Sequence, residues 1–336
     1  MTIELPVLRL GLAGFSAQQQ EALGAALSDA SGHLRWEISA FEEADAWWVN
    51  GARTHLVAEG TIRVRAAAPG SRAVQLHLPD IDRPIAFALP LVASALEPGY
   101  SFDPKSPESI AAILAEFEGW LAPITAQFCL ASEIVENQSA LGRGVYDFGV
   151  GGRLLAVVDM HGEVGVLPGL DPNEFENAEW HPRTTRARVP DNFIRTTLSQ
   201  LMWHYSVRTQ RDLLPRHYRT GLLYFRRPPR LPARLLQDTH LLLMRELATA
   251  PASFEALRMR TGMAAPQLAH ALAALYFVGS ITSNPKRATP SPVRRDDTEG
   301  SLYSQLPSGL DSVSPAEPPR LPPMQDFTAP APIGPR

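Results

Sequence analysis

The sequence has almost no cysteine, since Cys129 is the only one among 336 residues. A single cysteine cannot form a disulfide within the chain or a zinc site from paired cysteines, so neither a disulfide nor such a zinc site stabilises the fold. Lysine is also scarce, and Lys105 and Lys286 are the only two. No apolar run reaches the roughly 18 residues of a membrane span. The first residues also lack the basic start and cleavage site of a secretory leader. We therefore expect a cytoplasmic protein that does not enter a membrane.

The rest of the composition is that of a globular chain, with 45% hydrophobic residues and a length that allows two or three domains. Charge is unevenly distributed along it. Residues 1–182 hold 10 basic and 24 acidic side chains, a balance of −14, and residues 183–234 hold 12 and 2, a balance of +10. Residues 235–336 balance at 9 and 9. An acidic body, a basic segment and a neutral end predict units with different surfaces.

The end of the chain, residues 283–336, contains 12 prolines among 54 residues. Such a composition buries too little apolar surface to offset its ordering entropy, so we expect a disordered tail with polyproline II character. Its PPRLPPM segment resembles ligands of aromatic grooves on partner proteins, and a tail that binds nothing is the simpler alternative. The string PPRLP occurs twice, at Pro228–Pro232 and at Pro318–Pro322.

Residues 1–100 alternate between short apolar segments and more polar ones. A helix is predicted after Ser16, between the first two of five apolar strands. We place these strands at Val7–Ala13, Leu34–Ala40, Asp45–Val49, Ala73–Leu78 and Ile85–Leu91. Short buried strands separated by helices or long turns predict an α/β domain with a parallel sheet.

The segments VLRLGLAGFS, EEADAWWVNGA and IAFALPLV resemble, in this order, the receiver domain of two-component response regulators. The resemblance covers roughly residues 5–97 and implies a receiver-like fold. Receivers hold Mg²⁺ with an acidic pair after the first strand, accept phosphate on an aspartate after the third, and use a lysine after the last.

The three positions that carry this chemistry in receivers are occupied by other residue types. Phe15 and Ser16 replace the acidic pair, Asn50 stands at the phosphoacceptor position, and Ala88-Leu89-Pro90 contains no lysine. Without carboxylates there is neither a hard-cation site nor an aspartyl nucleophile. We therefore expect a pseudo-receiver that serves dimerisation or partner docking.

Residues 101–182 are predicted to form a small α+β module. A helix starts at Ser106-Pro107 and continues to Leu121 with apolar spacings of three and four. A β-meander is expected from Gly144 to Leu167, because Gly151-Gly152 and His161-Gly162 supply tight hairpin turns.

Residues 183–231 form an arginine-rich connecting region with interleaved aromatic side chains. Arginine alternating with aromatic rings is typical of sites for single-stranded nucleic acid or phosphorylated ligands. The same pattern also suits a basic face that packs on the acidic body of its own chain or on a protein partner. The candidate contacts are Arg208, Arg211, Arg216, Arg219, Arg226, Arg227 and Arg230.

Residues 232–282 resemble the winged-helix form of the helix-turn-helix. A leucine-rich helix ends near Ala250-Pro251, a short helix follows Ser253, and a third begins at Pro266 and closes at Gly279. The outward residues of this third helix are mostly alanine, which favours protein packing over base readout. The candidate surface residues are Arg258, Arg260, Gln267 and His270.

No catalytic constellation emerges from the sequence. Asp147-Phe148-Gly149 matches a kinase tripeptide, but the HRD and VAIK motifs that accompany it in kinases are absent. None of the nine histidines is paired at helical metal-ligand spacing, so we predict no metal site and no cofactor. Cys129 lies in an apolar stretch typical of a buried thiol.

These patterns together predict a non-enzymatic bacterial signalling adaptor that acts through protein–protein interaction. The first alternative is a transcription regulator whose winged helix and arginine region bind DNA together. The second is a sensor of a phosphorylated small ligand, bound by the arginine region. The partner, the signal and the oligomeric state are open at this stage.

Overall fold

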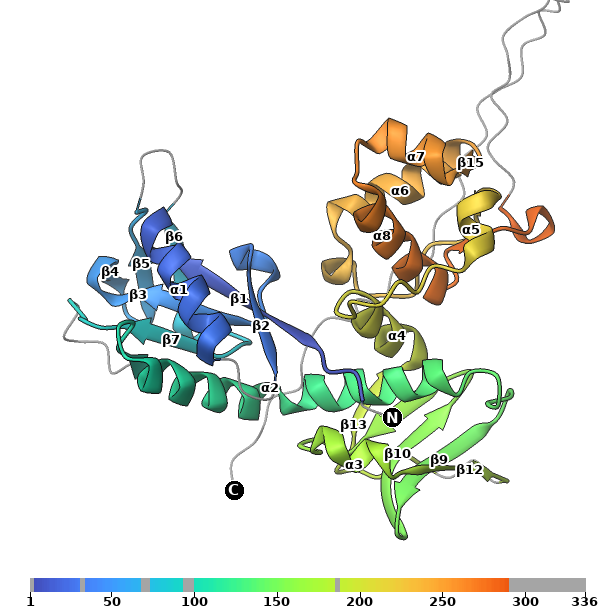
Figure 1. Ribbon diagram of the computed structural model, residues 1–336, viewed down its shortest axis with the longest axis horizontal. Helices are drawn as coiled ribbons and strands as arrows, with labels where there is room; N and C mark the ends of the chain where they lie inside the picture. The colour runs from blue at the N-terminus through green and yellow to red at the C-terminus, as the bar shows by residue number, and fades with distance from the viewer. Residues whose placement is uncertain (1–2, 31–33, 68–72, 93–99, 185–187, 290–336) are drawn as a thin grey trace, which may run out of the picture. The chain divides into compact units, whose positions relative to one another are not determined.

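A computed structural model describes residues 3–30, 34–67, 73–92, 100–184 and 188–289 (Figure 1). All of them belong to one compact unit of the chain. The disorder and partner docking predicted for the proline-rich tail fall mostly on residues 290–336, which lie outside the described residues.

A five-stranded parallel sheet forms from the N-terminal part of the chain. Its strands occur in the order β2-β1-β3-β7-β8, and every neighbouring pair is parallel. Buried apolar residues predicted most of these segments. The strands are β1 (Val7–Ala13), β2 (Arg35–Ser39), β3 (Ala46–Asn50), β7 (Ile85–Ala88) and β8 (Ser101–Phe102).

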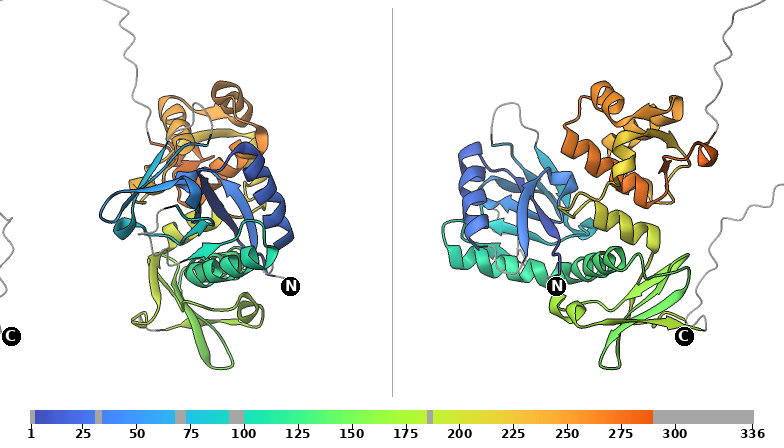
Figure 2. Two further views of the ribbon diagram at one scale, coloured as in Figure 1. Left: turned by 90° about the vertical axis from the view of Figure 1, so that its left-hand side faces the viewer. Right: turned by 45° about the vertical axis from the view of Figure 1, so that its right-hand side comes forward.

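The two faces of this sheet are covered differently. Helix α1 (Ala17–Ala30) and the first half of α2 (Pro107–Glu136) pack on one face. The other face carries a small antiparallel sheet made of β4 (Thr54–Ala58), β5 (Thr61–Val64) and β6 (Val74–His77), seen from two sides in Figure 2. The expectation that residues 73–78 join the parallel sheet is therefore wrong. This segment pairs with β5 instead. Leu76 is its only buried residue, which suits a sheet with one face in solvent and does not suit a parallel sheet covered on both faces.

Helix α2 is longer than its sequence pattern predicted. Ser106 caps it by accepting the backbone N–H of Ser109, and Pro107 occupies the first turn. The helix continues beyond Leu121, past Pro123 inside it, to Glu136. Its first half lies in the core of the parallel sheet, and its second half lies in the core of a second sheet.

The second sheet is antiparallel and has five strands in the order β12-β9-β10-β11-β13. Helices α3 (Pro172–Glu176) and α4 (Leu198–Ser206) pack with it. The outer two strands were not predicted, and β13 lies within the arginine-rich segment. The strands are β9 (Val145–Val150), β10 (Arg153–Asp159), β11 (Glu163–Val166), β12 (Glu179–Arg183) and β13 (Ile194–Thr197).

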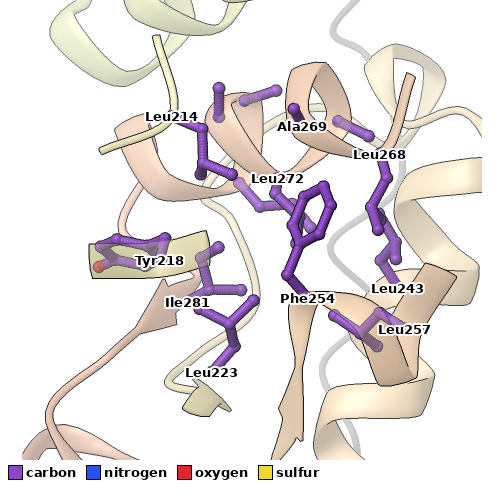
Figure 3. Packing of buried hydrophobic residues seen from close by; sticks show 14 of the residues in the cluster. Leu214, Tyr218, Leu223, Leu243, Phe254, Leu257, Leu268, Ala269, Leu272 and Ile281 are labelled. Atoms are coloured by element: carbon purple, nitrogen blue, oxygen red, sulfur yellow. The ribbon is translucent and has the colours of Figure 1, made fainter. Parts of the chain in front are cut away.

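The C-terminal part combines helices with a small antiparallel sheet in the order β15-β14-β16. Phe254, Leu257 and Leu272 meet in its core, shown in Figure 3. Its elements are α5 (Arg216–Thr220), β14 (Leu222–Phe225), α6 (Asp238–Thr249), β15 (Ala252–Ser253), α7 (Phe254–Thr261), α8 (Ala265–Phe277) and β16 (Ile281–Thr282). Short 3-10 helices occur at Phe41–Glu43, Gly51–Arg53, Leu78–Asp80, Ala233–Leu235 and Pro285–Arg287.

The predicted start of the disordered tail is too early. Disorder was expected from Ser283, but residues 284–289 are held in place, because Thr289 donates its backbone N–H to the carbonyl of Phe225 at 2.9 Å.

Within the ranges that the structure describes, none of the helices combines the length and apolar character needed to cross a membrane.

Candidate functional site in the arginine-rich segment

A buried ion pair joins the parallel sheet to the end of α4. Asp45, directly before β3, lies 2.5 Å from the Arg208 guanidinium, and the two side chains are 6% and 11% exposed. The second carboxylate oxygen of Asp45 accepts the backbone N–H of Arg9 at 3.0 Å. Arg9 in turn donates to the carbonyl of Val207 at 2.6 Å. The charge of Arg208 is therefore matched by a buried carboxylate, although the pair also borders a cavity of about 650 Å³.

His204 adds a titratable group to this cluster. Nη1 of Arg208 lies 3.3 Å from Nδ1 of His204, a contact that suits an unprotonated ring nitrogen as the acceptor. Burial, together with the charge of Arg208, lowers the pKa of His204 to about 4. Burial and Arg208 also lower the pKa of Arg9. The imidazole is consequently neutral near pH 7.

Glutamates from two distant segments hold Arg211. Its guanidinium pairs with Glu136 at the end of α2, and lies 3.9 Å from Glu4, which precedes β1. Glu4 also accepts hydrogen bonds from the hydroxyls of Tyr205, at 2.8 Å, and Thr209. Burial and the bond to Glu4 raise the pKa of Tyr205 to about 12. Arg211 thus contributes to docking the N-terminal segment onto α4.

The other arginines of the segment fall into two groups. Arg219 pairs with Asp212, and its guanidinium carbon lies 5.3 Å from the ring centroid of Phe254. Among the described arginines of residues 183–234, four have no carboxylate within ion-pair distance. These are Arg216, Arg226, Arg227 and Arg230.

Two of the unpaired arginines, Arg227 and Arg230, line one cavity of about 780 Å³. The opposite walls are the turn at 161–163 and the β13–α4 junction at 195–200. Arg195 on this wall is already paired with Asp191 at 2.8 Å. Glu163, which also lines the cavity, lies 3.9 Å from Arg195, so the positive charge that is not offset comes from Arg227 and Arg230.

Helix α8 is buried on two sides. Leu268, Leu272 and Leu275 lie in the core shared with α6 and α7. On another side α8 packs on α4, where His270 hydrogen-bonds the backbone of Val207 and Phe277 packs against the core that contains Tyr205. Buried alanines permit the close approach of these helices. They are Ala269, Ala271, Ala273 and Ala274.

The four residues proposed as the surface of this C-terminal part are not brought together as one face. Arg258 pairs with Glu255 at 2.9 Å within α7, and Arg260 lies 3.9 Å from Glu246 of α6. Gln267 and His270 instead line a cavity of about 600 Å³ beside Val207 and Arg9. Burial lowers the pKa of His270.

Asn50 has a structural role at the end of β3. It is 8% exposed, donates to the carbonyl of Gly14 at 3.0 Å, and accepts the backbone N–H of Ala52 at 3.1 Å. The side chain therefore ties together the ends of two neighbouring strands. Both Nδ2 and Oδ1 of Asn50 are engaged in these hydrogen bonds, and the amide is not a nucleophile that could accept a phosphoryl group.

Other sequence candidates also occupy structural positions. Asp147 lies in β9 and pairs with Arg183 of β12 at 3.0 Å. Burial raises the pKa of Cys129 to about 12, which keeps the thiol protonated and poorly nucleophilic. Over the described ranges, no group of three or more His, Cys, Asp or Glu side chains is arranged to hold a metal ion.

Sequence reasoning did not identify the acidic partners Glu4 and Asp45, nor the wall at 195–200. No local signal marks them, because each partner of an arginine lies in a remote part of the chain. Comparison with known protein families, curated proteins and solved structures finds no match for this chain.

Proposed function

We propose that the chain is a non-enzymatic cytoplasmic adaptor of bacterial signalling that acts through protein–protein contacts. The observation that carries this proposal is the burial of α8 between its own core and α4. A helix that is largely buried from Leu268 onward favours a role in the scaffold, since only its first turn, with Pro266 and Gln267, is exposed to a partner such as DNA.

The C-terminal part is winged-helix-like in the order of α6, β15, α7, α8 and β16. It departs from the usual arrangement because the third strand of its sheet, β14, precedes α6 in the chain. The residues after β16 pass back over β14 and form no wing among the described residues. Two features of DNA-binding winged helices, a third helix exposed along its length and a wing, thus have no counterpart among the described residues.

The N-terminal part supports the receiver-like interpretation through its strand order. The order β2-β1-β3-β7-β8 corresponds to the 2-1-3-4-5 order of flavodoxin-like sheets. At the edge where such folds place their chemistry, Asn50 and Phe15 are buried. Buried residues without carboxylates at this edge favour a role in docking a partner protein over a role in phosphotransfer.

Exposed apolar side chains near this edge offer a docking face. Val57 on β4 is 57% exposed, and Val92 after β7 is 61% exposed. The backbone N–H of Val92 bonds to the carbonyl of Gly51 at 3.4 Å, which brings the segment after β7 next to the one that leads into β4. Exposed apolar side chains mark candidate interaction sites, and we propose Val57 and Val92 as such contacts.

Affinity capture from source cells tests the adaptor proposal. The full chain is expected to retain a specific partner that a Val57→Asp/Val92→Asp variant no longer retains. The matched control is Met259→Asp on α7, where the native side chain is 81% exposed. Equal capture by all three proteins would contradict this docking face.

A mobility-shift titration with random-sequence duplex DNA, at low and near-physiological salt, tests the DNA alternative. We expect no complex at either salt concentration. Tight binding that weakens steeply with salt, and is lost in an Arg258→Ala/Arg260→Ala variant, would establish the transcription-regulator alternative instead.

A further inference from the structure

The cavity that contains Arg227 and Arg230 is suited to a small organic ligand. Its volume of about 780 Å³ lies within the range of small-molecule sites. Met160 and Leu198 supply apolar wall, and Ser199 and His161 supply polar groups that can hydrogen-bond a ligand. The cavity therefore combines a pair of cations with surface for an uncharged part of the same molecule.

The two arginines that line the cavity are separated by two prolines, which stiffen the segment between them. Pro228 and Pro229, between them, fix the backbone angle φ near −65°. The chain bends at Arg230 and Leu231, directly after the two prolines. Arg227 and Arg230 both line the same cavity.

This segment is anchored at both ends. The backbone N–H of Arg226 donates to the carbonyl of Ser280 at 2.8 Å, and Thr289 bonds to Phe225. At the other end, Leu231 packs against the C-terminal core. A ligand that binds here does not have to order the backbone carrying the arginines, which lowers the entropic cost of binding.

The charge of the cavity defines the class of ligand. Among the side chains that line the cavity, Glu163 lies 3.9 Å from the Arg195 guanidinium and offsets its charge. Two positive charges of the lining then remain, on Arg227 and Arg230. Guanidinium groups bind phosphate oxygens with charge-assisted, often bidentate hydrogen bonds. We propose that this cavity binds a small molecule through a diphosphate group held by Arg227 and Arg230. This site is independent of the docking face proposed above.

Titration of the full chain with inorganic pyrophosphate tests the proposal, with calorimetry and the melting temperature as readouts. Sodium chloride at matched ionic strength serves as the reference. We expect saturable binding and a rise in melting temperature for the wild-type protein. An Arg227→Gln/Arg230→Gln variant should bind at least about tenfold more weakly, because each lost charged hydrogen bond weakens binding by that order.

The matched control is Arg216→Gln, which removes an exposed arginine from α5 outside the cavity and should bind as the wild type does. The proposal is overturned if pyrophosphate gives no saturable binding beyond the salt reference, or if all three proteins bind equally. It is also overturned if duplex DNA binds in place of pyrophosphate and the double variant abolishes that binding.

Discussion

Arg208 and Arg227 belong to the same basic segment, but their guanidinium groups meet different surroundings. Arg208 is buried against Asp45, whereas Arg227 lines an open cavity in which its charge is not matched by a carboxylate among the described residues. The charge count of residues 183–234 treats both in the same way. The difference shows that one basic segment can supply buried ion pairs in one half and unpaired arginines at a cavity in the other.

The largest expected effect comes from removing the buried arginine. Arg208→Ala leaves Asp45 buried without its counter-charge, and should lower the free energy of unfolding by about 3–5 kcal/mol. Urea denaturation measures this change. Arg216→Ala, at an exposed and unpaired arginine, should stay within about 0.5 kcal/mol of the wild type. Similar losses for both variants would remove the distinction between the two groups.

The pH dependence of stability sharpens the same comparison through His204. Its pKa is about 4 in the folded protein against an ordinary value of 6.5. The unfolded chain binds the additional proton between these values, so the contribution of neutral His204 is complete above pH 6.5 and is lost as the pH falls toward 4. Its size is on the order of 3 kcal/mol. A His204→Gln variant should flatten this part of the stability profile, and an unchanged profile would show that another group is responsible.

Among the paired arginines, the smallest effect is expected at Arg211. This side chain is 43% exposed, and its pair with Glu136 is in contact with solvent. Arg211→Ala should therefore lower stability by only about 0.5–1 kcal/mol, and added salt should reduce the difference. A loss of stability as large as that of Arg208→Ala, measured in the same urea series, would mean that burial does not determine how much each of these two ion pairs stabilises the fold.

Apolar strands were the most predictable part of the fold. The segments of β1, β3 and β7 were found because their buried residues are nearly continuous, and β2 was found because its apolar and polar residues alternate. Strands β4 and β5 were missed because they mix polar and apolar residues around the turn at Gly60. Strand β12 was missed because it contains Pro182, and proline argues against a strand in a sequence pattern. The strand lies at the edge of its sheet, where proline is tolerated.

The candidate site was less predictable than the strands. The sequence identified the arginines as a group, and it identified alanine on α8 as a sign of helix packing. It could not separate paired from unpaired arginines, since the acidic partners Glu4 and Asp45 lie at least 163 residues before the arginines that they pair with in the sequence. The partner of each charge is decided by the way in which α4 meets the parallel sheet.

Urea unfolding of Arg227→Gln/Arg230→Gln, with and without pyrophosphate, tests the central claim most directly. The account predicts the wild-type midpoint without pyrophosphate, and no shift of this midpoint when pyrophosphate is added. The wild-type protein should shift to higher urea under the same conditions. A midpoint well below the wild type in the absence of pyrophosphate would contradict the claim, because it would make these arginines structural clamps like Arg208.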